Sequence, residues 1–247
     1  MNKVSEVTLS FWIMKICATT LGETAGDLLS MTLNVGYAVG SVILLSAFVV
    51  TLVAQLVARK FHPLLYWSVI LSTSTAGTTM SDYMDRTLGL GYATGSLILV
   101  LCLVLVLSAW RMSEGTLSVS HIQRPKVEMF YWVAILFSNT LGTAFGDFLA
   151  DNSGLGFLGG AVLVGGLIAL IALAMVFTQL NRVLLFWLAF VLTRPFGATF
   201  GDLLTKTSDK GGLGFGTIGS SGILAALLLA LILYTSFMIP RAEKSSA

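Results

Sequence analysis

Charged residues are scarce in this sequence of 247 residues. Asp, Glu, Lys and Arg make up 11% of the chain, whereas hydrophobic residues make up 56%. Because a soluble domain usually has about 25% charged residues, a soluble globular enzyme is excluded. A disordered chain is also excluded, since disorder requires low hydrophobicity and high net charge. The apolar runs are continuous rather than alternating, which favours membrane-spanning helices over a β-barrel.

Cysteine and net charge are equally limited. The two cysteines, Cys17 and Cys102, both lie inside apolar segments, so the chain has neither a disulfide framework nor a cysteine metal site. A net charge of +2 is too small to indicate a nucleic-acid partner. The sequence has no HExxH motif, nucleophile elbow, P-loop or dinucleotide fingerprint. We therefore expect neither an enzyme nor a protein with a resident cofactor.

The most informative feature of the sequence is an internal repeat. Four tryptophans are each followed 15 residues later by an aspartate, and a glycine lies ten residues after each tryptophan. A second glycine motif follows each aspartate: GYAVGS, GYATGS, GFLGGA and GFGTIGS, the last displaced by three residues. The repeated residues are Trp12, Trp67, Trp132 and Trp187; Asp27, Asp82, Asp147 and Asp202; and Gly22, Gly77, Gly142 and Gly197.

Each repeat contains two apolar stretches of about 20 residues, the length that crosses a bilayer. The sequence therefore predicts an all-α polytopic membrane protein with eight transmembrane helices. They are expected at 9–31, 36–58, 65–86, 91–111, 129–150, 157–179, 183–205 and 217–239. The repeats form one membrane domain and cover approximately 9–60, 64–112, 128–180 and 183–239, with a cytoplasmic linker at 113–127.

The parity of the repeats and the basic residues predict how the helices are arranged. A two-helix repeat returns to its starting side, so the four repeats are parallel copies with pseudo-symmetry about the membrane normal. The connections at the side of the two termini have more basic residues, which predicts cytoplasmic termini. They contain Lys3, Arg59, Lys60, Arg111, Arg124, Lys126, Arg182, Arg241 and Lys244, against Arg86, Lys206 and Lys210 on the other side.

Polar residues recur four, seven and eight positions before the repeated aspartates, along one face of a helix. A polar stripe of this kind must face the bundle interior, because lipid offers it no partner. Repeat four departs from the pattern with Ala198 and Pro195, and it has Arg194 inside the apolar segment. For Arg194 the alternatives are a salt bridge with Asp147 or Glu23 and the binding of an anionic substrate, and we favour the salt bridge. Lys15 is the other candidate counter-charge. The predicted ion path comprises Glu23, Asp27, Asp82, Asp147, Asp202, Thr20, Thr78, Asn139, Thr143 and Arg194.

The tryptophans and the GETAGD, GTTMSD, GTAFGD and GATFGD cores resemble a bacterial membrane family with four tandem copies of a repeat of unknown function. Each copy in that family has two transmembrane regions and a characteristic tryptophan. The resemblance extends from about Phe11 to Met238 and implies a bacterial inner-membrane location. The string from Glu23 to Asp27 also resembles the Glu-x-Gly-Asp motif of a manganese and calcium transporter family, with a spacing that differs by one.

The functional hypothesis is a transporter or exporter of a small cation that moves between the odd-numbered helices. A divalent metal such as Mn²⁺ is expected ahead of a proton or a monovalent ion. Oxygen ligands suit Mg²⁺, Ca²⁺ or Mn²⁺. The expected metal ligands are Glu23, Asp27 and Asp147, with Asp82 and Asp202 as supporting ligands. The first alternative is a cation channel with a pseudo-fourfold carboxylate ring. The second is a membrane scaffold whose aspartates are structural. The expected partners are the lipid bilayer and the cation, and the oligomeric state stays open.

Overall fold

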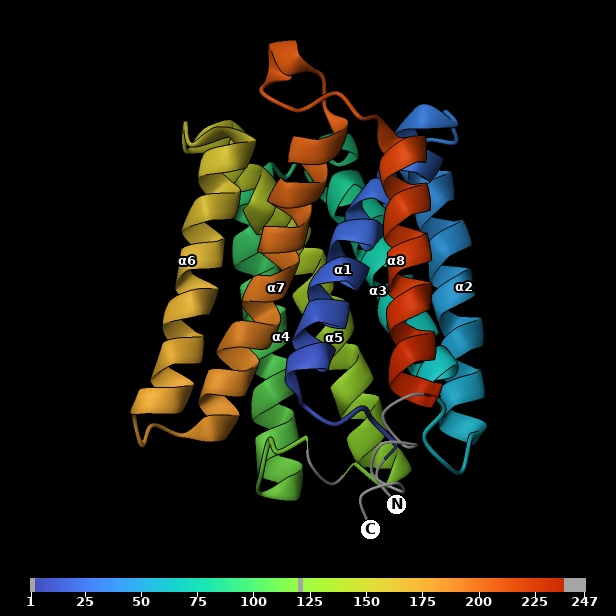
Figure 1. Cartoon of the computed structure of the whole chain (residues 1–247), viewed down its shortest axis with the longest axis vertical. Coiled ribbons are helices and arrows are strands. Elements are labelled where there is room, and N and C mark those ends of the chain that lie inside the picture. Colours follow the sequence, from blue (N-terminus) through green and yellow to red (C-terminus); the bar gives the residue numbers. More distant parts are fainter. Residues whose placement is uncertain (1–2, 120–121, 238–247) are drawn as a thin grey trace.

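The computed structural model is all-helical over the residues that it describes, 3–119 and 122–237. Figure 1 shows long helices running side by side, joined by short turns. The eight α-helices in these ranges are α1 (Leu9–Asp27), α2 (Tyr37–Val57), α3 (Pro63–Asp82), α4 (Tyr92–Glu114), α5 (Pro125–Asp147), α6 (Gly156–Phe177), α7 (Arg182–Thr205) and α8 (Thr217–Phe237). Each coincides with a predicted helix. The last predicted helical positions, 238–239, and the basic residues Arg241 and Lys244 lie outside the described ranges.

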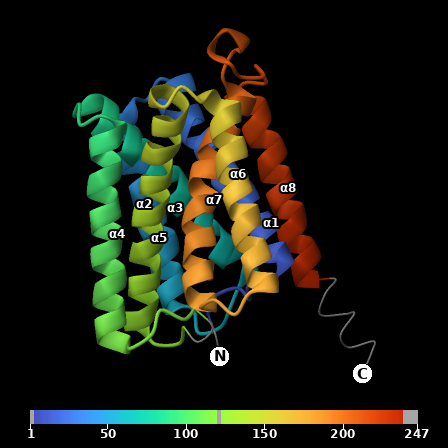
Figure 2. The same cartoon turned by 90° about the vertical axis from the view of Figure 1, so that its left-hand side faces the viewer.

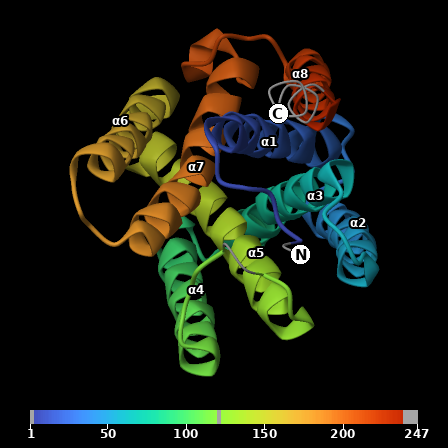
Figure 3. The same ribbon diagram turned by 60° about the horizontal axis from the view of Figure 1, so that its bottom comes forward.

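Four helices form an inner ring and the other four surround it (Figure 3). In the ring, α1 contacts α3, α3 contacts α5, α5 contacts α7, and α7 returns to α1. The outer helices do not pack mainly on the inner helix of their own repeat. Instead α2 packs on α3, α4 on α5, α6 on α7, and α8 on α1. Every repeat therefore covers its successor, and the last outer helix closes the bundle on the first inner helix.

Inner and outer helices differ in how much of their surface the protein buries. Among the described residues, six helices are long and apolar enough to cross a membrane: α2, α4, α5 with its short extension, α6, α7 and α8. In the outer four, at most 22% of the most apolar window is buried, against 72% in α5 and 61% in α7. The remaining two, α1 and α3, carry many polar residues, and the ring buries them.

The turn after the aspartate is alike in three repeats. Short π-helical segments continue α1, α3 and α5 beyond the aspartate: η1 (Leu28–Thr32), η2 (Tyr83–Thr87) and η3 (Phe148–Asn152). The next α-helix then starts at a glycine with φ of +80° at Gly36, +72° at Gly91 and +66° at Gly156. This backbone conformation favours glycine, which explains why the second motif repeats. Repeat four has the 3₁₀ turn η4 (Ser208–Lys210) instead, where its motif is displaced.

The end of the inner ring where α1 begins, here called the tryptophan end, is filled with aromatic side chains. Trp67 and Trp132 are buried between helices rather than placed at the surface as anchors. The hydroxyls of Tyr66 and Tyr131 are 2.6 Å apart. Figure 2 shows that α8 ends at the same end of the bundle.

The segment before α1 closes the tryptophan end further. The Lys3 ammonium is 2.6 Å from a carboxylate oxygen of Glu128, which is fully buried. Gln55 donates to the carbonyl of Lys3 and to the other oxygen of Glu128. A buried lysine and a buried carboxylate thus satisfy each other, which fixes the N-terminal segment across the ends of the helices.

Candidate functional site

The four repeated aspartates lie together at the opposite end of the inner ring, here called the aspartate end. Asp27, Asp82 and Asp147 each end an α-helix, and Asp202 lies in the last turn of α7. All four are 2–3% exposed, although they lie near the helix ends. A carboxylate removed from solvent needs charged or hydrogen-bonding partners, because an isolated buried charge is costly.

Two cations provide those partners, and each bridges two helices. Arg86 Nε is 2.9 Å from Asp82 Oδ1, and Arg86 Nη2 is 3.0 Å from Asp147 Oδ2. Lys206 Nζ is 2.5 Å from Asp27 Oδ2 and 3.0 Å from Asp202 Oδ1. The four aspartates are therefore held as two pairs, one on α3 and α5 and the other on α1 and α7.

Arg86 and Lys206 were not predicted as counter-charges from the sequence. Each lies four residues after the aspartate of its own repeat, a spacing that brings side chains together on a helix. The same position holds Met31 in repeat one and Asp151 in repeat three. Only repeats two and four supply a cation, and this alternation was the signal that could have revealed the two pairs.

Lys206 follows the last residue of α7 and its side chain is 18% exposed. Burial alone would lower the pKa of Lys206, but the carboxylates of Asp202 and Asp27 outweigh it and raise the pKa above its usual value. The ammonium therefore stays charged at neutral pH. Arg86, with a side chain 31% exposed, has the matching place in the other pair. Both cations separate the aspartates from the surface.

The guanidinium of Arg194, from α7, lies one helical turn deeper in the ring than the aspartates and connects all four inner helices. Its Nη1 donates to Glu23 Oε2 at 2.9 Å, the salt bridge with Glu23 that the sequence predicted as one of two choices. Its Nη2 donates to Thr78 Oγ1 at 2.5 Å and to Thr143 Oγ1 at 2.8 Å. These partners come from α1, α3 and α5, and Arg194 is fully buried.

The sequence of repeat four explains why an arginine has this role. Four residues before their aspartates, the first three repeats carry Glu23, Thr78 and Thr143, whereas repeat four has Ala198. The Arg194 backbone lies one helical turn before Ala198. Its side chain extends to the level of Ala198, which has no polar group of its own. Gly142 makes room for it, since a Cβ there would lie 2.3 Å from Arg194 Cγ.

The repeated glycines make the same contact at all four interfaces of the ring. Each faces the residue eight positions before the aspartate of the next inner helix, at a distance that leaves no room for a Cβ. Close approach through small residues is a usual way for membrane helices to pack. The contacts are Gly22 with Ser74, Gly77 with Asn139, Gly142 with Arg194 and Gly197 with Thr19.

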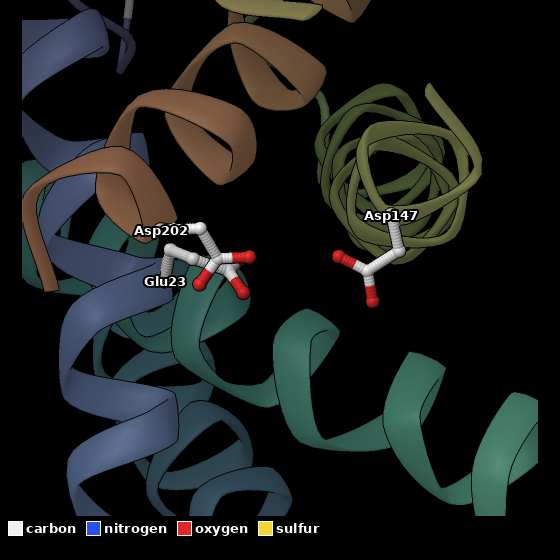
Figure 4. A group of neighbouring side chains, drawn as sticks. All are labelled: Glu23, Asp147 and Asp202. Atoms are coloured by element: carbon white, nitrogen blue, oxygen red, sulfur yellow. The ribbon is translucent and has the colours of Figure 1, made fainter. Parts of the chain in front are cut away.

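Three carboxylates from three helices converge between the Arg194 hub and the aspartate pairs. One oxygen each of Glu23, Asp147 and Asp202 can be chosen so that all three lie within 4.8 Å of one another, and all three residues are buried. Figure 4 shows Glu23 and Asp202 side by side, with Asp147 pointing toward them from α5. Carboxylate oxygens at this separation are ligands that Mg²⁺, Mn²⁺ or Ca²⁺ accepts.

The predicted metal ligands and this group overlap in two residues. Glu23 and Asp147 belong to it, Asp202 is its third member, and Asp27 instead faces Lys206. The predicted path residues Thr78 and Thr143 lie at the Arg194 hub.

The other predicted path residues are not members of the carboxylate group. Thr20 bonds the carbonyl of Ile16 on its own helix, and Asp82 pairs with Arg86. Asn139 donates to Thr73 Oγ1 at 2.8 Å, nearer the tryptophan end.

Among the ion-paired side chains at this end of the ring, the charges do not balance. Five carboxylates, including Glu23, face three cations that are paired with them: Arg86, Arg194 and Lys206. If all are ionised, two negative charges are left over. A divalent cation or two protons would neutralise them.

The repeats identified in the sequence match a known family model. The model described as Repeat of Unknown Function (DUF347) matches residues 10–61, 65–116, 130–181 and 185–238, which is most of the chain. No curated protein and no solved structure matches the chain. With four tandem copies of its repeat, the chain belongs to the DUF347 repeat family.

Proposed function

We propose that all eight helices cross the membrane, as four parallel two-helix repeats around an axis along the membrane normal. The recurrence of the same glycine contact at the four inner interfaces supports this arrangement. The polar helices α1 and α3 can cross because the ring covers them, so their polar groups face protein rather than lipid. The excess of basic residues at the tryptophan end supports cytoplasmic termini in a bacterial inner membrane.

We further propose that the protein transports a small cation, a divalent metal first, through the centre of the ring. The observation that carries this proposal is the convergence of Glu23, Asp147 and Asp202 from three different helices. Charged residues inside a membrane protein are costly, and they mark ion or substrate pathways. The excess of two negative charges matches the charge of one divalent ion.

A carrier fits the arrangement better than an open channel. The aspartates do not form a free ring, because Arg86 and Lys206 hold them in pairs. At the other end, buried Trp67 and Trp132 fill the space between the helices. The cation would therefore reach its ligands only after one end opens, as alternating access requires.

A membrane scaffold is the second candidate, and the ion pairs themselves favour it. Arg194 ties four helices, and Arg86 and Lys206 each tie two, so the same charges could serve only to hold the ring together. The two candidates differ in what a conservative change does. In a transporter, Asp147→Asn stops flux while folding is retained, whereas in a scaffold it destabilises the protein or has no effect.

The test is cation flux into proteoliposomes that contain a metal-sensitive dye. Mn²⁺, Mg²⁺, Ca²⁺ and Zn²⁺ are compared, with and without a proton gradient, for the wild type, Asp147→Asn and Glu23→Gln. Asp209→Asn is the matched control, since Asp209 is an exposed acid in the turn η4. Flux that Asp147→Asn abolishes and Asp209→Asn preserves supports transport. Absence of flux from folded wild-type protein, for all four ions, rejects it.

A further inference from the structure

Lys15 is a buried amine that the carboxylate site does not use. It lies on α1 between the Arg194 hub and the aromatic tryptophan end, and it is fully buried. Its Nζ donates to Asn139 Oδ1 at 3.4 Å and lies 4.2 Å from the ring centre of Phe190. Within the described residues, no carboxylate lies within 4.0 Å of this amine, so Lys15 has no ion-pair partner there.

This environment distinguishes Lys15 from the other buried cations of the ring. Arg194, Arg86 and Lys206 each contact at least one carboxylate. A permanently charged ammonium with one long hydrogen bond and one aromatic face would lack compensation for the water that it has lost. A lysine, unlike an arginine, can release its proton when it is buried.

The charged and titratable groups around Lys15 come from each helix that packs near it. On α7, Arg194 lies one turn from Phe190, and on α1, Glu23 lies two turns from Lys15. One turn nearer the tryptophan end are Tyr66 of α3 and Tyr131 of α5. The outer helix α8, which packs on α1, has no charged residue. The nearest formal charge is therefore positive, on Arg194.

We propose that Lys15 is the proton-binding site that couples cation transport to a proton gradient; this rests on the proposed cation transport. The step breaks one N–H bond of the Lys15 ammonium. The electron pair stays on Nζ, and the proton passes to water on the side to which the ring is open. The reverse step recharges the amine from the other side.

Arg194 links this proton to the cation. A metal ion among the carboxylates competes with Arg194 for Glu23. The negative charge of Glu23 then neutralises less of the positive charge on the guanidinium. The stronger positive field then opposes a second positive charge on Lys15. Cation binding and Lys15 protonation are therefore alternatives, which makes the transport an exchange of cation for proton.

The test separates cation movement from proton coupling in proteoliposomes. The first assay measures Mn²⁺ exchange at equal concentrations without a pH gradient, and the second measures Mn²⁺ accumulation driven by a pH gradient. The variants are Lys15→Met, which is always neutral, and Lys15→Arg, which is always charged. Lys210→Met is the control, because Lys210 is an exposed lysine in η4.

We expect Lys15→Met to keep Mn²⁺ exchange and to lose accumulation. Lys15→Arg should lose both, because its permanent charge opposes cation binding, and Lys210→Met should retain both. Accumulation by either Lys15 variant overturns the proposal, and rescue by Lys15→Arg would show that only the charge matters. Loss of exchange in folded Lys15→Met also overturns it. If Lys15→Arg does not fold, Lys15→Met decides alone, since methionine has similar length.

The wild type distinguishes this inference from the proposed function. Mn²⁺ exchange that does not respond to a pH gradient rejects proton coupling and leaves cation transport intact. Absence of exchange for every cation rejects transport itself, and the coupling with it.

Discussion

The inner and outer helices of this protein reverse the usual distribution of polar and apolar residues in a globular protein, in which the apolar residues lie inside. The outer helices are the more apolar, and yet at most 22% of their apolar windows are buried. The inner helices carry carboxylates, hydroxyls, an arginine and a lysine, nearly all of them buried. In water this distribution would expose large apolar surfaces at great cost.

This distribution indicates which interactions stabilise the inner and the outer helices. Lipid is as apolar as leucine, so the outer helices gain little from hydrophobic burial, and close packing and polar contacts carry the association. The inner ring has both: glycines that admit neighbouring side chains, and ion pairs that cross between helices. We therefore expect substitutions to have large effects inside and small effects outside.

The largest expected effect comes from removing the hub. Arg194→Met leaves Glu23 and two threonines without their shared donor, and breaking a buried ion pair costs about 3–5 kcal/mol. Thermal unfolding in detergent measures the loss. The exposed Arg182→Met, at the start of the same helix, should change stability by less than about 0.5 kcal/mol. Equal effects of both variants would refute the hub.

Lys206→Met is expected to come next. It leaves Asp27 and Asp202 without their cation, and an unsatisfied buried group costs about 1–3 kcal/mol, more when it is charged. The same melting assay, with Lys210→Met as the exposed control, measures the difference. A Lys206→Met protein as stable as the control would mean that the aspartate pairs do not hold the ring.

Gly142→Ala tests close packing without any change of charge. The new Cβ would collide with Arg194 Cγ and Cβ, at 2.3 and 2.4 Å, and overpacking costs about 1–3 kcal/mol. The control is Gly166→Ala in the outer helix α6, where nothing lies within 4 Å of the added methyl group. That change should be neutral or stabilise the helix by about 0.4–1 kcal/mol. If Gly142 only provides backbone flexibility, Gly142→Ala and Gly166→Ala will not differ in stability in this way.

The smallest expected effect comes from a matched pair of Ile→Val substitutions, each of which removes one methylene. Ile70→Val removes a methylene from a fully buried side chain of α3, and such a change costs about 0.5–1.5 kcal/mol. Ile223→Val makes the same change on α8, where the side chain is 73% exposed. Its cost should be close to zero, because lipid or detergent replaces the lost contacts. A similar cost at both positions would show that a partner covers α8.

Residues close in sequence could be assigned to the site before the structure, and pairs from different helices could not. The polar face ending at Asp27, Asp82 and Asp147 follows from helical spacing, and the structure buries it as predicted. The sequence limited the ion-pair partner of Arg194 to Glu23 or Asp147. Only the packing of the ring selects Glu23. Asp27 was expected beside Glu23 and Asp147, but it pairs with Lys206 of another repeat, and Asp202 is the third member of the carboxylate group.

The sequence by itself determined the number of helices, their bounds to within a few residues, and which face is polar in the inner helices of the first three repeats. These properties follow from apolar length, from the period of 3.6 residues and from fourfold repetition, which are all local. The tertiary structure alone decided that each outer helix covers the next repeat, and which carboxylates meet. Those contacts join residues far apart in the chain, and they depend on how closely the glycines let neighbouring helices approach.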